Sequence, residues 1–336
     1  MNYRDLGRTG LRVSELGMGC SGIGRTLYRR DDRESLATLL ESLDRGVNLF
    51  DTAPGYSSGE CERLIGTAFR GRRDQLVIAS KAGTTATAIG RLAKRGKHLL
   101  RPVRHLLRPV QTRLPRLYLA QRRVDFSRDF ITRSLEASLK RLQTDYLDLL
   151  FLHHPTDAVL EEAGFRETML ALKQAGKIRH WGVSADTPQQ AMLCLAVPGI
   201  EVIQLDISLL SETPLTAFLS RAREQNVGVV ARKVLGQGLL AQAGGQTKAD
   251  RWELDGQRLQ ERRRRAVQLA SRQGGERSLL QAALLYVRGL EDVASAVVGY
   301  STRRHLRENI EVYDRPLQPS GATPMSHACS QRTKAT

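Results

Sequence analysis

The sequence predicts an α/β protein, a (β/α)8 TIM barrel with a long basic insertion after strand 3, and three observations lead to this fold class. Short apolar runs rich in β-branched residues alternate with longer segments of helical periodicity. The apolar runs are almost continuous, which is typical of parallel strands covered on both faces. The chain has 336 residues, which is enough for one large barrel.

Eight segments have the character of such strands, and this number favours a closed barrel over an open, doubly wound sheet. An open sheet would need a glycine-rich phosphate turn that leads into a helix. The early glycines are spaced GxGxxGxG, from Gly17 to Gly24, but no helical apolar pattern begins at the last of them. The expected strands are Val13–Cys20, Val47–Ala53, Leu76–Lys81, Leu147–His153, Ile178–Ser184, Val202–Ile207, Val227–Lys233 and Ala294–Tyr300.

Capping residues mark the starts of several helices between these strands. Ser127 precedes a run whose apolar residues recur with a period close to 3.6. Thr187 stands before a proline, which suits a capping position followed by the first helical residue. Pro214 and Arg277 open two further helical patterns. We therefore expect each strand to be followed by at least one helix.

A single barrel domain is expected over residues 1–318, with insertions at about 83–124 and 241–275. Residues 319–336 are polar and expected to be disordered. The first insertion carries most of the net charge of +17, because Arg91 to Arg123 contains eleven Lys or Arg and no acidic residue. It is either a solvated appendage or a docking surface for an acidic partner or an anionic surface. Specific nucleic-acid binding is not expected, since Tyr118 is its only aromatic residue.

Other features limit the class of protein. The four cysteines are scattered without metal-ligand spacing, which predicts neither a metal site nor a disulfide framework. No apolar stretch is long enough for a transmembrane segment, and the first residues lack the apolar core of a secretory signal. These observations together predict a cytoplasmic protein with reduced thiols.

Four ionisable side chains follow consecutive expected strands. Asp51 and Tyr56 come after the second strand, Lys81 ends the third, and His153 ends the fourth. In a (β/α)8 barrel these strand ends meet at one mouth, where catalytic groups lie. Each residue alone is compatible with a structural role, but the set has a chemical logic that a random set would lack.

That logic concerns the protonation of a substrate oxygen by Tyr56. A phenol has a pKa near 10, and a neighbouring ammonium such as that of Lys81 lowers it toward neutrality. Asp51 would hold the lysine charged, and His153 would orient a carbonyl oxygen or relay a proton. His154 is adjacent to His153, and alternation along a strand lets only one of them line the mouth. Because Pro155 follows, we expect His154 to be extended, in a substrate loop or a packing role.

The segment around Tyr56 resembles the signature of the aldo-keto reductases. The matching motifs are Asn48-Leu-Phe-Asp-Thr-Ala-Pro-Gly-Tyr, Gly59-Glu-Cys-Glu, Leu64-Ile-Gly, Asp145-Tyr-Leu-Asp-Leu-Leu, Gly182-Val-Ser and Leu235-Gly-Gln-Gly-Leu-Leu. The resemblance implies an NAD(P)H-dependent oxidoreductase that interconverts an aldehyde or ketone and an alcohol. It also implies a catalytic tetrad of Asp51, Tyr56, Lys81 and His153, with a small carbonyl compound or alcohol as substrate.

The resemblance further implies a set of cofactor contacts, with NADP as the expected cofactor and NAD as the alternative. Ser184 and Gln204 match contacts to the nicotinamide carboxamide, although the asparagine that often follows the serine is Ala185 here. Arg232 stands where many members stack an aromatic residue on the nicotinamide, and a guanidinium plane can also stack on a ring. Amides of the turn from Leu235 through Gly236 to Gly238 would hold the pyrophosphate. The full expected set is Gly22, Ser184, Gln204, Arg232, Leu235, Gly236, Gly238, Ser301, Arg304, Glu308 and Asn309.

The adenosine end carries one departure from the family pattern. Glu308 and Asn309 match the adenine contacts, but the arginine expected three residues before that glutamate is His305. Arg303 or Arg304 would then bind the 2′-phosphate of NADP.

Two other functions compete with this interpretation. Potassium-channel β-subunits resemble the same fold, so a regulatory subunit that uses bound cofactor as a redox sensor is the main alternative. A barrel hydrolase would need paired carboxylates or metal ligands at the mouth, and the strand ends show no such pair.

Overall fold

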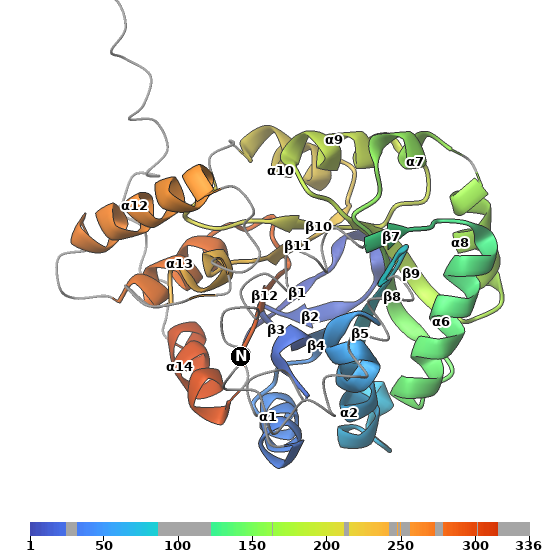
Figure 1. Ribbon diagram of the computed structural model, residues 1–336, viewed down its shortest axis with the longest axis horizontal. Helices are drawn as coiled ribbons and strands as arrows, with labels where there is room; N and C mark the ends of the chain where they lie inside the picture. The colour runs from blue at the N-terminus through green and yellow to red at the C-terminus, as the bar shows by residue number, and fades with distance from the viewer. Residues whose placement is uncertain are drawn as a thin grey trace, which may run out of the picture.

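Eight parallel strands close into a barrel in the computed structural model (Figure 1). The structure describes residues 1–24, 32–86, 122–162, 164–211, 215–241, 247, 249, 256–272, 278–300 and 302–314. The predicted (β/α)8 architecture is confirmed. The barrel strands are β3 (Leu16–Gly19), β4 (Leu49–Asp51), β5 (Val77–Ala82), β8 (Leu147–His153), β9 (Ile178–Ser184), β10 (Val202–Asp206), β11 (Gly228–Arg232) and β12 (Ser295–Val298).

Helices surround the barrel, as Figure 1 shows, and several begin at the predicted capping residues. The hydroxyls of Ser127 and Thr187 accept hydrogen bonds from backbone N–H groups in their first turns, and Ser278 forms a capping box. The helices are α1 (Asp32–Asp44), α2 (Glu60–Ala68), α6 (Arg128–Leu142), α7 (Asp157–Glu161), α8 (Gly164–Gln174), α9 (Pro188–Ala196), α10 (Thr216–Glu224), α12 (Gly256–Arg272), α13 (Leu279–Arg288) and α14 (Arg303–Asp314).

The first expected strand, 13–20, is wrong in one respect, because the structure divides it in two. β2 (Arg12–Ser14) pairs antiparallel with β1 (Tyr3–Asp5), and only β3 enters the barrel. The division falls at Glu15, whose carboxylate is held by Arg4 and Arg288 at 2.8 and 3.2 Å. The hairpin also buries Leu6 and Val13 against the inner residues of the barrel and thereby closes its N-terminal end.

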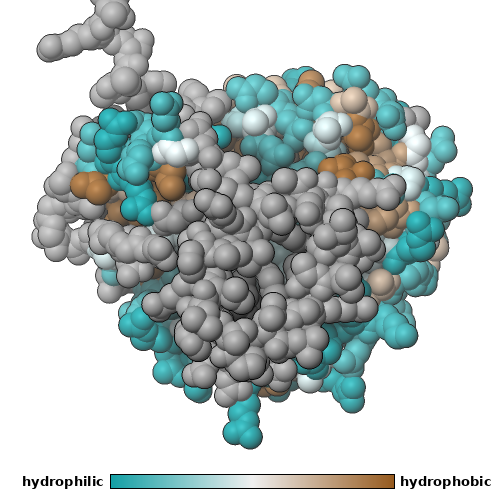
Figure 2. Space-filling model, viewed as in Figure 1, coloured by the Kyte–Doolittle hydropathy of each residue, from teal (hydrophilic) through white to brown (hydrophobic). Residues whose placement is uncertain are grey.

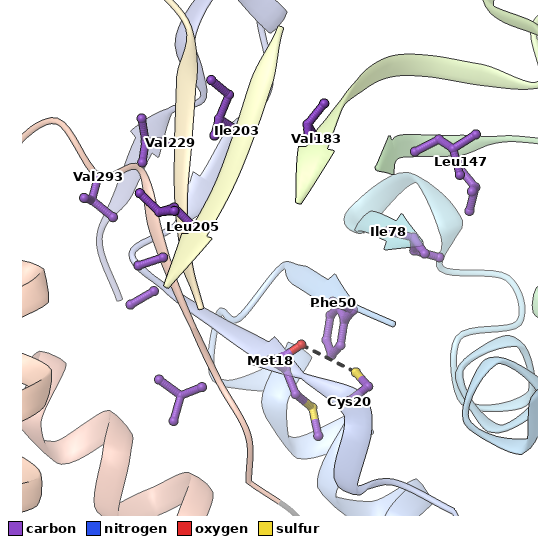
Figure 3. Packing of buried hydrophobic residues seen from close by; sticks show 14 of the residues in the cluster. Met18, Cys20, Phe50, Ile78, Leu147, Val183, Ile203, Leu205, Val229 and Val293 are labelled. Carbon is purple, nitrogen blue, oxygen red and sulfur yellow. Dashed lines mark hydrogen bonds between the residues drawn. The ribbon is translucent and has the colours of Figure 1, made fainter. Parts of the chain in front are cut away.

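The buried apolar side chains form two layers, one inside the barrel and one between the strands and the surrounding helices. Inner residues such as Leu49, Ala79 and Phe151 form one cluster, and their sequence neighbours form the larger outer cluster. Figure 3 shows part of the outer cluster, where the Cys20 thiol donates to the Met18 carbonyl at 3.5 Å. This inward–outward alternation fixes which side chain at each strand end points into the mouth.

The two expected insertions differ in how the structure describes them. The ends of the first one pair as an antiparallel ribbon of β6 (Thr84–Ala86) and β7 (Arg122–Val124), while 87–121 lie outside the described residues. The second contains α12, whose inner face packs Leu259, Ala266 and Leu269 on the segments around Leu210 and Leu239. The surface over α12 is mostly hydrophilic (Figure 2). The 319–336 tail lies outside the described residues. Within the part of the chain that is described, no helix combines the length and apolarity needed to cross a membrane.

Candidate active site

In each barrel strand, every second side chain points inward, and these side chains form the inner row of that strand. The inner rows of six strands end in polar side chains at one mouth of the barrel. Asp51 continues the inward position of Leu49, two residues before it, and Lys81 continues that of Ala79. By the same alternation the other inner rows end at His153, Ser184, Gln204 and Arg232. All six side chains are buried. The structure therefore brings together the strand-end residues that the sequence predicted for this mouth.

Lys81 is the centre of this group. Its ammonium donates to Asp51 Oδ1 at 2.5 Å and to the carbonyl oxygen of Thr52 at 2.9 Å. Burial alone would lower the pKa of Lys81, but the carboxylate of Asp51 and the phenol of Tyr56 outweigh it, so that pKa is raised. The lysine is thus a fixed positive charge in a site that excludes most solvent.

Tyr56 begins the short helical segment η3 (Tyr56–Gly59) after β4. Its backbone N–H donates to the carbonyl of Ala53, and the following Ser57 and Ser58 both have positive φ, at 49° and 64°. The Lys81 ammonium lies 5.2 Å from the centre of the half-buried phenol ring. Burial raises the pKa of Tyr56, and the positive charges of Lys81 and Arg232 only oppose that rise, so the predicted lowering of this pKa toward neutrality is not found. The phenol is therefore neutral at physiological pH and can act as a proton donor.

His153 and His154 lie together at the end of β8. His153 Nδ1 is 2.8 Å from the hydroxyl of Thr84, which follows Lys81 by three residues. The expectation that His154 is extended is wrong, because its φ is +56°. Its ring packs 4.4 Å from that of His153. The left-handed turn lets His154 Nδ1 contact the carboxylate of Asp186, a long-range partner that local sequence cannot reveal.

A buried hydrogen-bonded chain links the residues of β4, β9 and β10. The Ser184 hydroxyl donates to Gln204 Oε1 at 2.9 Å, and Gln204 Nε2 donates to Asp51 Oδ1 at 3.0 Å. Because Asp51 also binds Lys81, the expected cofactor contacts and the expected catalytic residues share one network. The orientation of each member is fixed by its neighbours in this network.

Arg232 lies on the opposite side of the mouth, where it joins β11 to the loops after β8 and β9. Its Nε is 2.7 Å from the Asp206 carboxylate, and its Nη2 donates to Ala185 O at 2.9 Å. Further contacts reach Asp186 at 3.3 Å and His154 Nε2 at 3.4 Å. The hydrogen bonds from Nη1 and Nη2 and the ion pairs with Asp206 and Asp186 restrict the position of the guanidinium.

The turn after β11 combines right-handed and left-handed backbone conformations. Leu235 (φ −88°, ψ 20°) is followed by Gly236 with φ +55° and Gln237 with φ +60°. The amides of Gly236 and Gly238, which the sequence assigned to a pyrophosphate, donate instead to the carbonyls of Lys233 and Leu235 and so fix the turn. A Cβ on Gly236 would approach Leu210 to 2.6 Å, so this position needs glycine for space as well as for φ.

The sequence did not indicate that α12 contributes to this site. Arg262 lies on the inner face of that helix and donates to the Gln237 side chain at 3.3 Å. The only signal was the four-arginine run itself, in which nothing distinguished Arg262. Likewise, Thr84 and Asp186 enter the site through contacts between segments that are distant in sequence.

The residues expected at the adenosine end lie at the start of α14. Arg303 is paired with Glu34 of α1 at 3.1 Å, and hydrogen bonds from the backbone N–H and then the guanidinium of Arg303 lower the pKa of Glu34. Arg304, by contrast, is 78% exposed and lies 3.7 Å from Glu308. Asn309 is buried, and Ser301 lies outside the described residues. At the other end of the site, Gly22 is buried in η2 (Cys20–Gly22), beside the loop that carries Tyr56.

A sequence model of the aldo/keto reductase family matches residues 15–325, which is most of the chain and includes every residue of this mouth. The chain belongs to the aldo/keto reductase family. It is 32% identical over 244 residues to the aldo-keto reductase YhdN of Bacillus subtilis (strain 168), a match that covers 71% of this chain and 64% of that protein.

Two further relatives of this aldo/keto reductase match over greater lengths. It is 28% identical over 320 residues to the uncharacterized oxidoreductase YqkF of the same bacterium, covering 93% of this chain and 90% of YqkF. The solved holo form of the aldo-keto reductase AKR11C1 from Bacillus halodurans superposes with a TM-score of 0.72 at 26% identity. That superposition covers 95% of this chain and 93% of AKR11C1. The family assignment thus agrees with the observed barrel.

Proposed function

We propose that this aldo/keto reductase reduces an aldehyde or ketone to an alcohol with NADPH, and catalyses the reverse reaction when the alcohol is in excess. One observation carries this proposal. A buried lysine lies between a carboxylate and the phenol of Tyr56, and a histidine lies at the adjacent strand end. A phenol beside a fixed cation is suited to protonate an oxygen on which negative charge develops.

The four residues divide the work of proton transfer. Tyr56 donates a hydrogen bond to the substrate carbonyl oxygen and transfers its proton as the oxygen becomes an alkoxide. Lys81 stabilises the resulting phenolate, because its ammonium is held beside the ring by Asp51. His153, oriented by Thr84, directs its other ring nitrogen toward the carbonyl oxygen. When bound, the nicotinamide cofactor supplies the hydride that the carbonyl carbon receives.

The mouth has groups that fit such a cofactor at both of its ends. Ser184 offers a hydroxyl and Gln204 an amide for a carboxamide, and the turn from Leu235 to Gly238 is the proposed site of the pyrophosphate. Arg262 adds a positive charge at the same turn. Arg304 is the better candidate for the 2′-phosphate, since Arg303 already pairs with Glu34. Gly22, Gly238, Ser301, Glu308 and Asn309 complete the proposed binding site.

Other aspects of the proposal concern the whole protein. The substrate is a small carbonyl compound, and the protein acts in the cytoplasm as one barrel domain over residues 1–318. The basic segment 91–123 remains a candidate docking surface for an acidic partner or anionic surface. The two ends of the insertion that contains this segment, Thr84–Ala86 and Arg122–Val124, pair in the β6–β7 ribbon, where Thr84 contacts His153 of the active-site mouth.

The proposal is tested by measuring cofactor binding and turnover with the purified full-length protein. NADPH should bind more tightly than NADH, and NADPH oxidation should accelerate when aldehydes or ketones from a broad panel are added. Tight NADPH binding with no measurable turnover on any carbonyl would instead favour the redox-sensing alternative. Failure to bind either nucleotide would contradict the proposal altogether.

A further inference from the structure

Glu62 is a fully buried carboxylate that lies between the helix α2 and the strand that carries Lys81. It belongs to the first turn of α2, which follows the Tyr56 segment η3 without a break. One carboxylate oxygen accepts a hydrogen bond from the Ser80 hydroxyl at 2.8 Å, and the other accepts one from Arg141 Nε at 2.7 Å. Because a buried carboxylate is costly without such partners, these two contacts determine where the side chain lies.

Ser80 connects Glu62 to the strand end that carries the buried lysine. Alternation along β5 directs Ala79 and Lys81 into the barrel and Ser80 outward, toward α2. Ser80 immediately precedes Lys81, so its hydrogen bond to Glu62 holds the backbone next to the lysine. The position of the ammonium therefore depends on this outer contact as well as on Asp51 inside the mouth.

Arg141 connects Glu62 to the turn that follows the proposed proton donor. Ser57, Ser58 and Gly59 all have positive φ, at 49°, 64° and 89°, a conformation that residues with side chains rarely adopt. The Arg141 side chain lies directly against this turn, because a Cβ on Gly59 would approach its Cδ to 2.8 Å. A backbone of this kind persists only where its surroundings hold it, and the ion pair with Glu62 fixes Arg141 in that place.

We propose that Glu62 is a positioning residue that sets the place of the Tyr56 phenol relative to the Lys81 ammonium. This inference rests on the function proposed above. Glu62 acts through Ser80 and Arg141 on the two backbone segments that carry these groups. The ammonium lies 5.2 Å from the centre of the phenol ring, and the attraction between a cation and a phenolate falls as their separation grows. Loss of Glu62 should therefore slow proton transfer and leave nucleotide binding intact.

Three substitutions separate the contacts of Glu62. Glu62→Met keeps the length of the side chain and loses both hydrogen bonds, whereas the amide of Glu62→Gln can still accept from Arg141 and donate to the Ser80 hydroxyl. Ser80→Ala removes only the contact with β5, and it decides the question alone if Glu62→Met does not fold. Asp148→Asn is the matched control, because it changes another fully buried carboxylate that is paired with arginines, at the opposite end of the barrel.

The rate of NADPH oxidation in a single turnover is measured for each folded protein with a saturating carbonyl substrate. We expect this rate to fall about tenfold or more in Glu62→Met and several-fold in Ser80→Ala, because small displacements of reacting groups are costly. Glu62→Gln should stay within about threefold of the wild type, and Asp148→Asn should match it. The dissociation constant for NADPH should change by less than about twofold in every variant.

The same substitutions are then made in a Tyr56→Phe background, where no phenol is left to position. There we expect Glu62→Met and Ser80→Ala to change the residual rate by less than about twofold, since residues that act through one group are not additive. A general loosening of the barrel would instead lower the rate by similar factors in both backgrounds, and that result would overturn the inference.

The outcomes also separate this inference from the proposed function. If the wild type oxidises NADPH with no carbonyl substrate, the proposed function fails. If the wild type and Asp148→Asn are active and Ser80→Ala and any folded Glu62→Met match their rates, only the positioning role of Glu62 is overturned.

Discussion

The two ends of the barrel each bury a carboxylate between strands, but they use it differently. At the N-terminal end, Asp148 is fully buried, accepts the backbone N–H of Ile78 at 2.9 Å, and pairs with Arg73 and Arg179 at 2.6 and 3.1 Å. The guanidinium groups of both arginines also lie over the Tyr146 ring, at 4.0 and 4.3 Å from its centre. At the mouth, Asp51 binds Lys81 and Gln204.

The difference lies in what each cation faces. At the N-terminal end the contacts of the two arginines are with Asp148, Tyr146 and neighbouring backbone or hydroxyl groups, so the cluster joins β5, β8 and β9. At the mouth, Lys81 is held from one side and faces a half-buried phenol on the other. The same type of buried ion pair therefore serves stability at one end and reactivity at the other.

The largest expected effect is on turnover at the mouth. Lys81→Met removes the cation beside Tyr56, so the phenolate formed after proton transfer is no longer stabilised. We expect kcat for carbonyl reduction to fall by about 10³-fold or more, measured by steady-state NADPH oxidation. NADPH affinity should change little. A variant with near-normal kcat would show that Tyr56 does not depend on this lysine.

The matching change at the other end should affect stability instead. Asp148→Ala leaves Arg73, Arg179 and the Ile78 N–H without their shared acceptor, and the loss of a buried acceptor whose arginine partners are in part exposed costs about 1–3 kcal/mol. The free energy of unfolding, measured with denaturant, should fall by this amount. The kcat of the folded fraction should be unchanged. A loss of kcat comparable to that of Lys81→Met would contradict the proposed difference between the two ends of the barrel.

A smaller effect is expected at α14, where two adjacent arginines provide a matched pair. Arg304→Ala should weaken NADPH binding about tenfold and leave NADH binding unchanged, because Arg304 is exposed and available to a 2′-phosphate. Arg303→Ala should change the affinity for either nucleotide much less, since Arg303 is engaged by Glu34. Equal effects of the two substitutions in a binding titration would contradict this assignment.

The smallest effect concerns pH and the support of Arg232. Asp186 is buried in part, which opposes ionisation, but His154 and Arg232 lower its pKa from 3.8 to about 2. A depressed pKa in the folded state means that this carboxylate stabilises the protein above pH 4 and that the contribution is lost as pH falls toward 2. Asp186 is half exposed, so we expect a difference of about 1 kcal/mol or less between wild type and Asp186→Asn at pH 6. Thermal unfolding at pH 6 and pH 3 checks whether the difference between the two proteins becomes smaller in acid.

Much of the fold could be predicted because each strand carries its own signal. The buried apolar runs located all eight barrel strands, and alternation along them placed Asp51, Lys81 and His153 at one mouth. The division of the first strand at Glu15 could not be predicted in this way. It depends on Arg288, which is more than 250 residues away in the sequence.

The candidate site was less predictable where contacts between distant segments determine the backbone conformation or the packing. His154 turns left-handed toward Asp186, although local sequence before a proline favours an extended conformation. Arg262 could not be singled out within its run of arginines, because its contact with the Gln237 turn depends on how α12 packs. Residues fixed by their own strand were predictable, and residues fixed by a partner segment were not.

The central claim is that Tyr56 donates the proton during carbonyl reduction, and single-turnover kinetics of Tyr56→Phe test it most directly. The variant keeps the ring that packs beside Lys81 and loses only the hydroxyl. With NADPH bound in advance and an active carbonyl added, we predict that the rate of NADPH oxidation falls by about 10³-fold. NADPH affinity and the unfolding temperature should remain close to those of the wild type. A Tyr56→Phe enzyme that oxidises NADPH at the wild-type rate would contradict the account.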